Sequence, residues 1–405
     1  MAAVSPFRAL RPAPLAASRV AAVPYDVVNT AEARALAAGN PLSFLHVSRA
    51  EIDLPEDTEP FADAVYAQAV RNFRRLSDEA PLVREDTPSL YVYRLRHGDH
   101  AQTGVAGTWA VDEYDDGTIR KHEHTRRDKE DDRTRHVIDL RAQTGPVFLT
   151  YRQVPAVDAV VARTMERSAL YDFKAPDGVQ HAVWRVEAAD LDMLRQAFEP
   201  VPALYIADGH HRAASAARAR RELAGPGGAS GAWDWFLAVA FPDVQVRILP
   251  YNRVVTDLGS STPQALLAAL AARFTVRDGP AVPERRGEVA CFLDGAWRTI
   301  AFGGAPAEAS PADRLDVSRL QNGVLAPMLG IEDVRTDRRL DFVGGARGTG
   351  ELEARVRSGR AAVAFSLHPV SVEELMAISD AGGTMPPKST WFEPKLRDGL
   401  LSHAI

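Results

Sequence analysis

A short apolar strand that breaks into a polar turn and then a helix is the sequence feature that most constrains the fold. Residues 203–207 read ALYIA, residues 208–212 read DGHHR, and residues 213–223 are rich in alanine. A short apolar run bounded by a turn is typical of a buried strand, and alanine has the highest helix propensity. The pattern therefore predicts a strand, a turn and a helix, the building unit of α/β proteins.

Further apolar patterns predict the same alternation along the chain. Helices are predicted at residues 30–39, with Thr30 as N-cap, and at residues 66–76, 191–198, 263–274, 315–329 and 371–380. Strands are predicted at residues 42–47, 235–241, 246–255, 288–302 and 361–367, and a hairpin is predicted around residues 97–100. We expect the strands at 235–241 and 246–255 to extend one sheet.

The predicted fold class is α/β (α+β), with a mixed sheet and flanking helices. The chain has 405 residues, of which 46% are hydrophobic, and this is enough for two or three cores. We expect an N-terminal core at residues 1–256, which carries the polar segments around residues 121–126 and 208–212. A smaller C-terminal α/β region is expected at residues 257–405, and the sequence leaves open whether it packs back onto the site.

Charge and cysteine content limit the possible partners. The formal net charge is −6, so no global basic field favours nucleic acid or anionic lipid, and any anion site must be local. No run approaches the roughly 18 apolar residues of a membrane helix. The single cysteine, Cys291, cannot form an internal disulfide, and we interpret it as a core residue on a hairpin strand. These features predict a cytoplasmic protein.

The DGHHR turn is the first candidate site. A helix begins there, and its first turn offers backbone N–H groups and the positive end of the helix dipole. Gly209 would let a ligand approach the backbone, and Arg212 would add a planar fork of donors suited to phosphate oxygens. The alternative is that Asp208 caps the helix while His210, His211 and Arg212 lie on its solvated face.

The second candidate is the segment 121–136, KHEHTRRDKEDDRTRH. If a strand continues over residues 118–125, His122 and His124 share one face and Glu123 lies on the other. Two histidines are weak support for zinc, so no metal site is predicted. Alternatively, Glu123 is a general base among cationic side chains. From Asp128 onward, a solvated helix with ion pairs is the favoured interpretation.

Two further segments are weaker candidates. In MPPKSTWFEPK, a rigid double proline precedes Lys388 and Ser389, although the glycine spacing of a phosphate-binding loop is absent. A surface turn is an equally good interpretation. Arg335, in RTDRRLDFVGG, would lie in a cleft or in a turn beside a strand. The sequence lacks a G-x-S-x-G elbow, an H-E-x-x-H motif and a dinucleotide fingerprint.

Long motifs in the chain resemble the family called domain of unknown function 1015. These are PFRALRP, PYDVV, NPLSFLHV, KHEHTR, KEDDRTRH, YIADGHHRAASA, ILPYNRVV, RTDRRLDFVGG and MPPKSTWFEPKLR, and they cover nearly the whole chain. The DGHHR turn is also similar to the signature turn of the ParB and sulfiredoxin superfamily, which includes kinases of free serine. This resemblance implies a ParB/sulfiredoxin-like core in which residues 208–212 hold phosphates and Glu123 activates a hydroxyl.

The resulting hypothesis is a nucleotide-dependent kinase that phosphorylates a small hydroxylated metabolite such as free serine. ATP or ADP and Mg²⁺ are expected by analogy. A phosphatase of phosphoserine-like esters and a non-catalytic nucleotide-binding or DNA-associated module are the alternatives, and a homodimer is left open. The predicted catalytic residues are Glu123, His122, His124, Asp208 and His210, and the predicted binding residues are Lys121, Arg126, Gly209, His211, Arg212, Arg335, Lys388 and Ser389.

Overall fold

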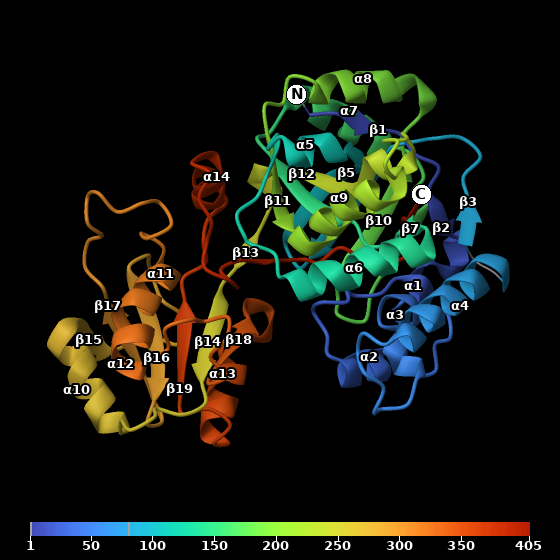
Figure 1. The fold of residues 1–405 in the computed structure, drawn as a ribbon. Helices are drawn as coiled ribbons and strands as arrows, with labels where there is room; N and C mark the ends of the chain where they lie inside the picture. Colours follow the sequence, from blue (N-terminus) through green and yellow to red (C-terminus); the bar gives the residue numbers. More distant parts are fainter. Residues whose placement is uncertain (1, 80–81) are drawn as a thin grey trace. The chain divides into compact units, whose positions relative to one another are not determined.

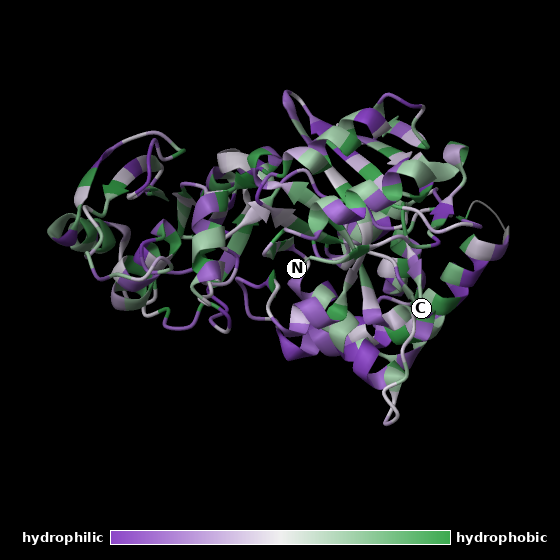
Figure 2. Cartoon of the chain, turned by 90° about the horizontal axis from the view of Figure 1, so that it is seen from above, coloured by the Kyte–Doolittle hydropathy of each residue, from purple (hydrophilic) through white to green (hydrophobic). Residues whose placement is uncertain are grey.

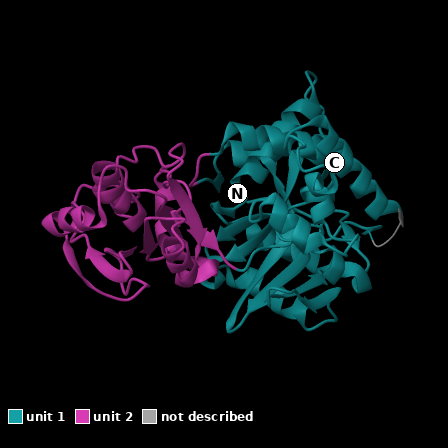
Figure 3. Cartoon of the chain, turned by 90° about the horizontal axis from the view of Figure 1, so that it is seen from below, with its two compact units in different colours: residues 1–121, 125–246, 394–405 teal, residues 122–124, 247–393 magenta. Residues whose placement is uncertain are grey.

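The chain divides into two compact units, each described here by itself (Figure 3). The computed structural model describes residues 2–79 and 82–405. Unit 1 consists of residues 1–121, 125–246 and 394–405, and unit 2 consists of residues 122–124 and 247–393. The chain therefore passes between the units four times, and two of these passages fall inside the segment 121–126.

Unit 1 is built on a mixed nine-stranded sheet in its described part (Figure 1). The strand order is β6-β11-β8-β12-β5-β4-β10-β9, and β1 also pairs with β5. The β11–β6 and β12–β8 pairs are parallel and the other pairs are antiparallel. The strands are β1 (Val4–Ser5), β4 (Tyr91–His97), β5 (His100–Ala110), β6 (Ile119–Arg120), β8 (Val147–Tyr151), β9 (Tyr171–Lys174), β10 (Gln180–Arg185), β11 (Leu204–Asp208) and β12 (Trp235–Pro242).

One face of this sheet is covered by α7 (Pro155–Met165), α8 (Ala188–Phe198) and α9 (His210–Ala224). Alternate residues of the strands, such as Val105 and Trp109 of β5, join a single apolar cluster with these helices. The Phe198 ring of α8 meets the Trp109 ring edge to face at 5.1 Å between centroids. The helices carry both hydrophobic and hydrophilic residues (Figure 2), as expected for helices with one buried face.

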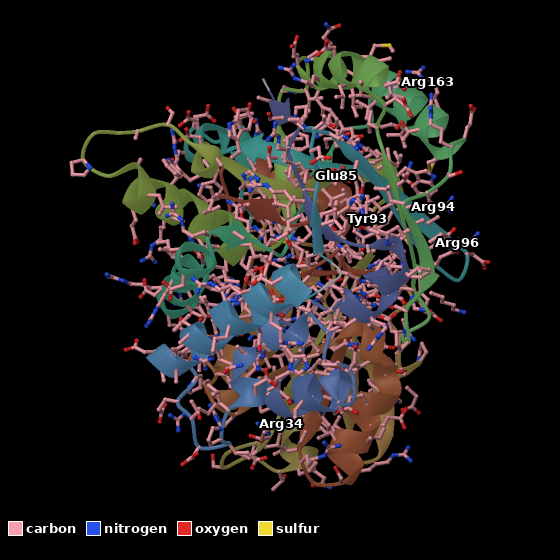
Figure 4. The ribbon with its side chains drawn as sticks, turned by 90° about the vertical axis from the view of Figure 1, so that its right-hand side faces the viewer. Arg34, Glu85, Tyr93, Arg94, Arg96 and Arg163 are labelled. Carbon is pink, nitrogen blue, oxygen red and sulfur yellow. The ribbon has the colours of Figure 1, made fainter. Side chains whose placement is uncertain are left out.

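The opposite face of the sheet contains a buried polar network. Tyr93 and Arg94 are consecutive on β4 and so point to opposite faces of the sheet (Figure 4). The Tyr93 hydroxyl lies 2.9 Å from Nδ1 of His181 on β10, and Nε of Arg397 donates to Nε2 of the same ring at 3.1 Å. The C-terminal segment 394–405 is therefore part of the core of unit 1.

A helical layer formed by the N-terminal segments completes unit 1. It packs around its own apolar cluster, and α6 contacts both α4 and α9. The remaining elements of unit 1 are β2 (Leu10–Pro12), η1 (Pro14–Ala16), α1 (Ala17–Val20), α2 (Thr30–Ala37), α3 (Leu45–Ser48), η2 (Ala50–Asp53), α4 (Asp63–Glu79), β3 (Leu82–Arg84), α5 (Val111–Asp115), α6 (Arg127–Leu140), β7 (Ala142–Gln143), η3 (Ala232–Asp234), η4 (Asp243–Gln245) and β21 (His403–Ala404).

Unit 2 is built on a second sheet, which has six strands in the order β15-β17-β16-β19-β14-β18 in the described residues. The strands are β14 (Tyr251–Val255), β15 (Thr275–Asp278), β16 (Glu288–Leu293), β17 (Ala296–Ala301), β18 (Leu340–Gly344) and β19 (Val363–Leu367), with a separate pair β13 (Ile248–Leu249) and β20 (Trp391–Phe392). The helices are α10 (Pro263–Arg273), α11 (Asp316–Leu320), η5 (Gln321–Leu325), α12 (Ala326–Leu329), η6 (Gly345–Arg347), α13 (Gly348–Arg357) and α14 (Val372–Asp380).

The predicted α+β class with a mixed sheet is confirmed, and so is the position of Cys291 on a hairpin strand. The predicted strand at residues 42–47 is wrong, because this segment leads into the short helix α3. Segment 246–255 does not extend the sheet of β12, because β14 pairs with β18 and β19 in unit 2. The N-cap of α2 is Asn29, whose side chain accepts from Glu32 N, and not Thr30.

The proposed division into a core at residues 1–256 and a C-terminal region at residues 257–405 stays a prediction. The compact units differ from it, because residues 247–256 belong to unit 2 and residues 394–405 belong to unit 1. In the part of the chain that the structure describes, no helix combines the length and the apolar content needed to cross a membrane.

We predict that Gly104→Ala destabilises unit 1. A Cβ at this position of β5 would lie 2.6 Å from the carbonyl oxygen of Ala240 and 2.8 Å from the ring of Phe241. Overpacking of this kind costs about 1–3 kcal/mol. The midpoint of urea unfolding should therefore fall. Gly227→Ala is the matched control, since a Cβ there would meet open space, and equal midpoints for the two variants would contradict this prediction.

Candidate functional site

The DGHHR turn joins β11 to α9, and a glycine is required at its second position. Gly209 is the N-cap of α9 and has φ 93°, a conformation that residues with a Cβ rarely adopt. A Cβ there would also come within 2.8 Å of Nε of Arg212. The first-turn N–H groups of α9 have no acceptor within the helix, and the positive end of its dipole lies at the turn.

Two cations converge on the carboxylate of Asp208 at this turn. Nη2 of Arg212 lies 3.0 Å from Oδ2, and Nζ of Lys395 lies 3.4 Å from Oδ1. Burial opposes the ionisation of Asp208, but the charges of Lys395 and Arg212 outweigh it and hold its pKa well below its ordinary value. Arg212 and Lys395 therefore bring two positive charges to one carboxylate beside the start of α9.

The Arg212 guanidinium is directed into unit 1. Its Nη1 donates to the carbonyl oxygen of Pro146, its side chain is 9% exposed, and its buried Nε has no hydrogen-bond partner among the described residues. Since both terminal nitrogens are engaged, Arg212 supplies charge and holds the turn in place. The predicted role of Arg212 as a fork of donors for phosphate oxygens stays a prediction.

The structure places one further predicted residue of unit 1, Arg126, beside the two histidines of this turn. His210 is buried in the first turn of α9, and Nε2 of His211 accepts a hydrogen bond from the backbone N–H of Arg126 at 3.0 Å. The Arg126 side chain forms two hydrogen bonds with Asp128, of 3.1 and 2.8 Å. The segment that leads into α6 is therefore attached to the DGHHR turn through His211.

Lys121 is the last residue of unit 1 before the chain enters unit 2. Its ammonium nitrogen lies 3.7 Å from the centroid of the Tyr114 ring, and burial lowers its pKa. The preceding strand β6 ends at Arg120, so the condition that a strand continues over residues 118–125 is not met. The face-sharing argument for His122 and His124 therefore fails.

Within unit 2, the segment 122–124 lies beside residues 384–385. The carbonyl oxygen of His122 accepts a hydrogen bond from the backbone N–H of Met385 at 2.8 Å. The Thr384 hydroxyl lies 3.4 Å from Nε2 of His124. His122 is buried, Glu123 is partly buried and His124 is exposed. Two of the motifs singled out in the sequence are thus neighbours in unit 2.

Lys388 and Ser389 follow in a tight turn of unit 2. Lys388 has φ 58°, and its ammonium lies 5.4 Å from the centroid of the Tyr251 ring. The buried Ser389 hydroxyl donates to the carbonyl oxygen of Pro386 at 2.5 Å. The turn is anchored by Arg253, which donates to the carbonyls of Tyr251 and Pro387, the latter at 3.2 Å.

Arg335 occupies an exposed turn before β18. Its side chain is 63% exposed and forms hydrogen bonds with Asp333 at 2.9 Å. The turn alternative is therefore the one observed for Arg335. Its predicted role in binding stays untested.

The C-terminal segment supplies charged residues that the sequence interpretation did not assign. Lys395 reaches Asp208, Arg397 pairs with Asp177, and Asp398 is 3% exposed. Oδ1 of Asp398 is buried without a hydrogen-bond partner among the described residues and lines a small cavity of about 40 Å³ together with Arg212. The run Lys395, Arg397 and Asp398 in an apolar C-terminus was the signal that could have revealed them.

The fold and this turn define an α+β protein with an electropositive helix N-terminus. The model of the family Protein of unknown function (DUF1015) matches residues 4–318. The chain therefore belongs to this family. A comparison with curated proteins found no match.

Several solved structures are distantly similar. A conserved hypothetical protein from Pyrococcus furiosus has 15% identity and a TM-score of 0.37, with 74% of this chain and 94% of that chain covered. A free serine kinase in complex with AMP has 14% identity and a TM-score of 0.38, with coverages of 75% and 91%. SbnI with C-terminal truncation from Staphylococcus aureus has 12% identity and a TM-score of 0.37, with coverages of 72% and 85%. The similarity is too distant to assign a function.

We predict that Asp398 makes the stability of unit 1 pH-dependent. Burial raises the pKa of Asp398 from 3.8 to about 7, so between these values the folded protein binds more protons than the unfolded chain. Its contribution to stability is therefore present below about pH 4 and is lost as the pH rises to about 7. Asp398→Asn should remove this loss, which is at most about 4 kcal/mol because one pKa unit corresponds to about 1.4 kcal/mol.

The measurement is urea unfolding of the wild-type protein and of Asp398→Asn at pH 4 and at pH 7.5. The difference between their free energies of unfolding should shift in favour of the variant as the pH rises. Asp57→Asn, at an exposed position, should show no such shift. A pH-independent difference for Asp398→Asn would show that this carboxyl is ionised in the folded protein at neutral pH.

Proposed function

We propose that the protein is a nucleotide-dependent phosphotransferase that binds phosphate groups at residues 208–212 and Lys395. One observation carries the proposal: Arg212 and Lys395 converge on Asp208 at the N-terminus of α9. Two cations lie at this turn, and the first turn of α9 adds backbone N–H donors and the helix dipole. Phosphate oxygens are suited to such a combination.

The residues of the turn have distinct roles in this proposal. Gly209 allows the phosphates to approach the backbone, and Arg212 holds the turn through Pro146 and Asp208. Lys395 neutralises phosphate charge, and His210 and His211 supply side chains at the start of the helix. Phosphoryl transfer depends mainly on such positioning and charge stabilisation.

ATP or ADP is the proposed phosphoryl donor, and Mg²⁺ would accompany its phosphates. The Oδ1 and Oδ2 atoms of Asp208 contact Lys395 and Arg212, respectively, so this carboxylate is poorly suited to ligate a divalent cation. An ion on the phosphates would offset charge on the transferred group.

The proposed acceptor is a small hydroxylated metabolite such as free serine, bound by residues 121–126. Glu123 would accept the proton of the hydroxyl while the oxygen attacks the terminal phosphorus and the shorter nucleotide leaves. The chain supports this assignment, because Glu123 lies only three residues before Arg126, whose N–H contacts His211. Lys388 and Ser389 would assist from the turn that follows Met385, which contacts His122.

The alternative enzyme is a phosphatase of phosphoserine-like esters. His210 favours this alternative, because it is a buried histidine of the turn and interacts electrostatically with Asp208. A histidine in this environment could act as nucleophile or acid. Capture of a phosphohistidine would distinguish the phosphatase from the kinase.

We predict that phosphorus NMR of the protein with Mg²⁺, ATP or ADP, and serine will show a new phosphoester signal. A parallel sample with phosphoserine alone should stay unchanged. Glu123→Gln should lower the rate by about 100-fold or more, because general base catalysis contributes roughly 10²–10⁴-fold. Free phosphate in the phosphoserine sample would instead indicate the phosphatase. Thermal protection by nucleotide without any turnover would indicate a binding module.

Lys395→Met should weaken nucleotide binding by about 10-fold or more, since the variant loses a cation that we place at the phosphates. Titration with ADP, followed by calorimetry, gives the dissociation constant. Lys174→Met is the matched control, because Lys174 is exposed on β9. Equal affinities of the two variants, with unchanged circular dichroism, would remove Lys395 from the phosphate site.

A further inference from the structure

Unit 1 contains a second cavity, of about 410 Å³, between α6 and the N-terminal helical layer. Its walls come from the start of α6, from η2 and from α4, and Arg126 is the only predicted site residue in its described lining. Cavities of about 300–1,000 Å³ are typical of sites for small organic ligands. The cavity is therefore large enough to hold a small organic ligand.

Aromatic rings form the apolar part of this cavity. Tyr25 and Tyr66 are buried, whereas Phe61 is 48% exposed. The Tyr66 hydroxyl donates to Oδ1 of Asp132 at 2.9 Å, which fixes the ring against α6. A large aromatic side chain that is half exposed at a cavity is well placed to cover a flat apolar ligand.

Most charged groups of the cavity neutralise one another in pairs. Nε of Arg49 lies 2.9 Å from Oε1 of Glu51. Nη2 of Arg133 lies 2.8 Å from Oδ2 of Asp132, and Arg126 is held by two hydrogen bonds to Asp128. These three pairs leave no net charge. Burial lowers the pKa of the remaining lining histidine, His136, to about 3, so it is neutral near pH 7.

Lys129 is the fourth cation of the lining and forms no ion pair among the described residues. Its ammonium instead lies 5.3 Å from the centroid of the Phe61 ring. The lining therefore has one positive charge in excess, although the whole chain has a formal net charge of −6. This charge lies beside the one aromatic side chain of the cavity that is substantially exposed.

We propose that this cavity binds a small organic monoanion with a flat apolar body, such as an aromatic carboxylate. Lys129 contacts the anionic group, and Phe61, Tyr66 and Tyr25 contact the body. A multiply charged nucleotide fits poorly, because the lining offers only one unpaired positive charge. The site is thus separate from the proposed phosphate site, and the inference does not rest on the phosphotransferase proposal.

The first α-helical turn of α6 links the two sites physically. The backbone N–H of Arg126, directly before α6, donates to His211, while the Arg126 side chain lines the cavity. Glu130, one turn further, lies 3.5 Å from Arg218 of α9. The cavity and the DGHHR turn are thus both in contact with the residues at the start of α6.

The experiment uses 8-anilinonaphthalene-1-sulfonate, a monoanion with a flat aromatic body, in a fluorescence titration of the full chain. N-phenyl-1-naphthylamine is the neutral probe with the same body. We expect one high-affinity site for the sulfonate. Lys129→Gln should weaken sulfonate binding by about 5- to 10-fold and change the affinity for the neutral probe by less than about twofold, whereas Phe61→Ala should weaken both.

Lys174→Gln is the matched control, since Lys174 is an exposed lysine on β9, and it should bind the sulfonate like the wild-type protein. Near-UV circular dichroism of each variant establishes that it is folded. Equal loss of the two probes in Lys129→Gln, or unchanged sulfonate affinity in that variant, would overturn the proposal. Competitive displacement of the sulfonate by ATP would also overturn it, because the cavity would then be a nucleotide site.

Discussion

The candidate site of unit 1 depends on the ion pairs that the carboxylate of Asp208 forms with Arg212 and Lys395. This carboxylate lies at the end of β11 and contacts Arg212, from the first turn of α9, and Lys395, from the C-terminal segment. Through Arg212 it is also connected to the carbonyl of Pro146, before β8. Removing one partner of a buried ion pair typically costs about 3–5 kcal/mol, because a charge is left uncompensated. The strand, the helix and the C-terminal segment are therefore held at one point by electrostatics, and the glycine at position 209 is the residue that lets the backbone turn there.

In unit 2, a buried arginine also holds a turn in place, but it donates hydrogen bonds to backbone carbonyls instead of a carboxylate. Arg253 is 1% exposed, and its described hydrogen bonds go to the carbonyls of Tyr251 and Pro387. Burial lowers its pKa to about 9, because backbone dipoles compensate a buried charge less well than a carboxylate does. This arginine ties the turn that contains Lys388 to β14. In both units, a buried arginine holds in place a turn that carries candidate site residues.

The local pattern of apolar residues predicted most helices and strands. It failed where a segment had only a weak preference for one of the two. The apolar run at residues 42–47 fits either a short strand or a helix, and packing in the N-terminal layer selected the helix α3. The segment at residues 118–125 has the composition of a strand only at its start, and β6 ends at Arg120. Strands that are consecutive in sequence often pair but need not do so, and β12 and β14 belong to different sheets.

The sequence by itself determined the α+β class, the family through its long motifs, and the strand–turn–helix unit around DGHHR, because these depend on residues that are close together along the chain. Tertiary structure alone decided that Lys395 reaches Asp208, that Arg212 points inward, and that Asp398 is buried beside it. It also decided that the chain divides at Lys121, His124, Val246 and Glu393. The physical reason is that these contacts join residues up to about two hundred positions apart, where no periodicity or turn preference specifies which charges will meet.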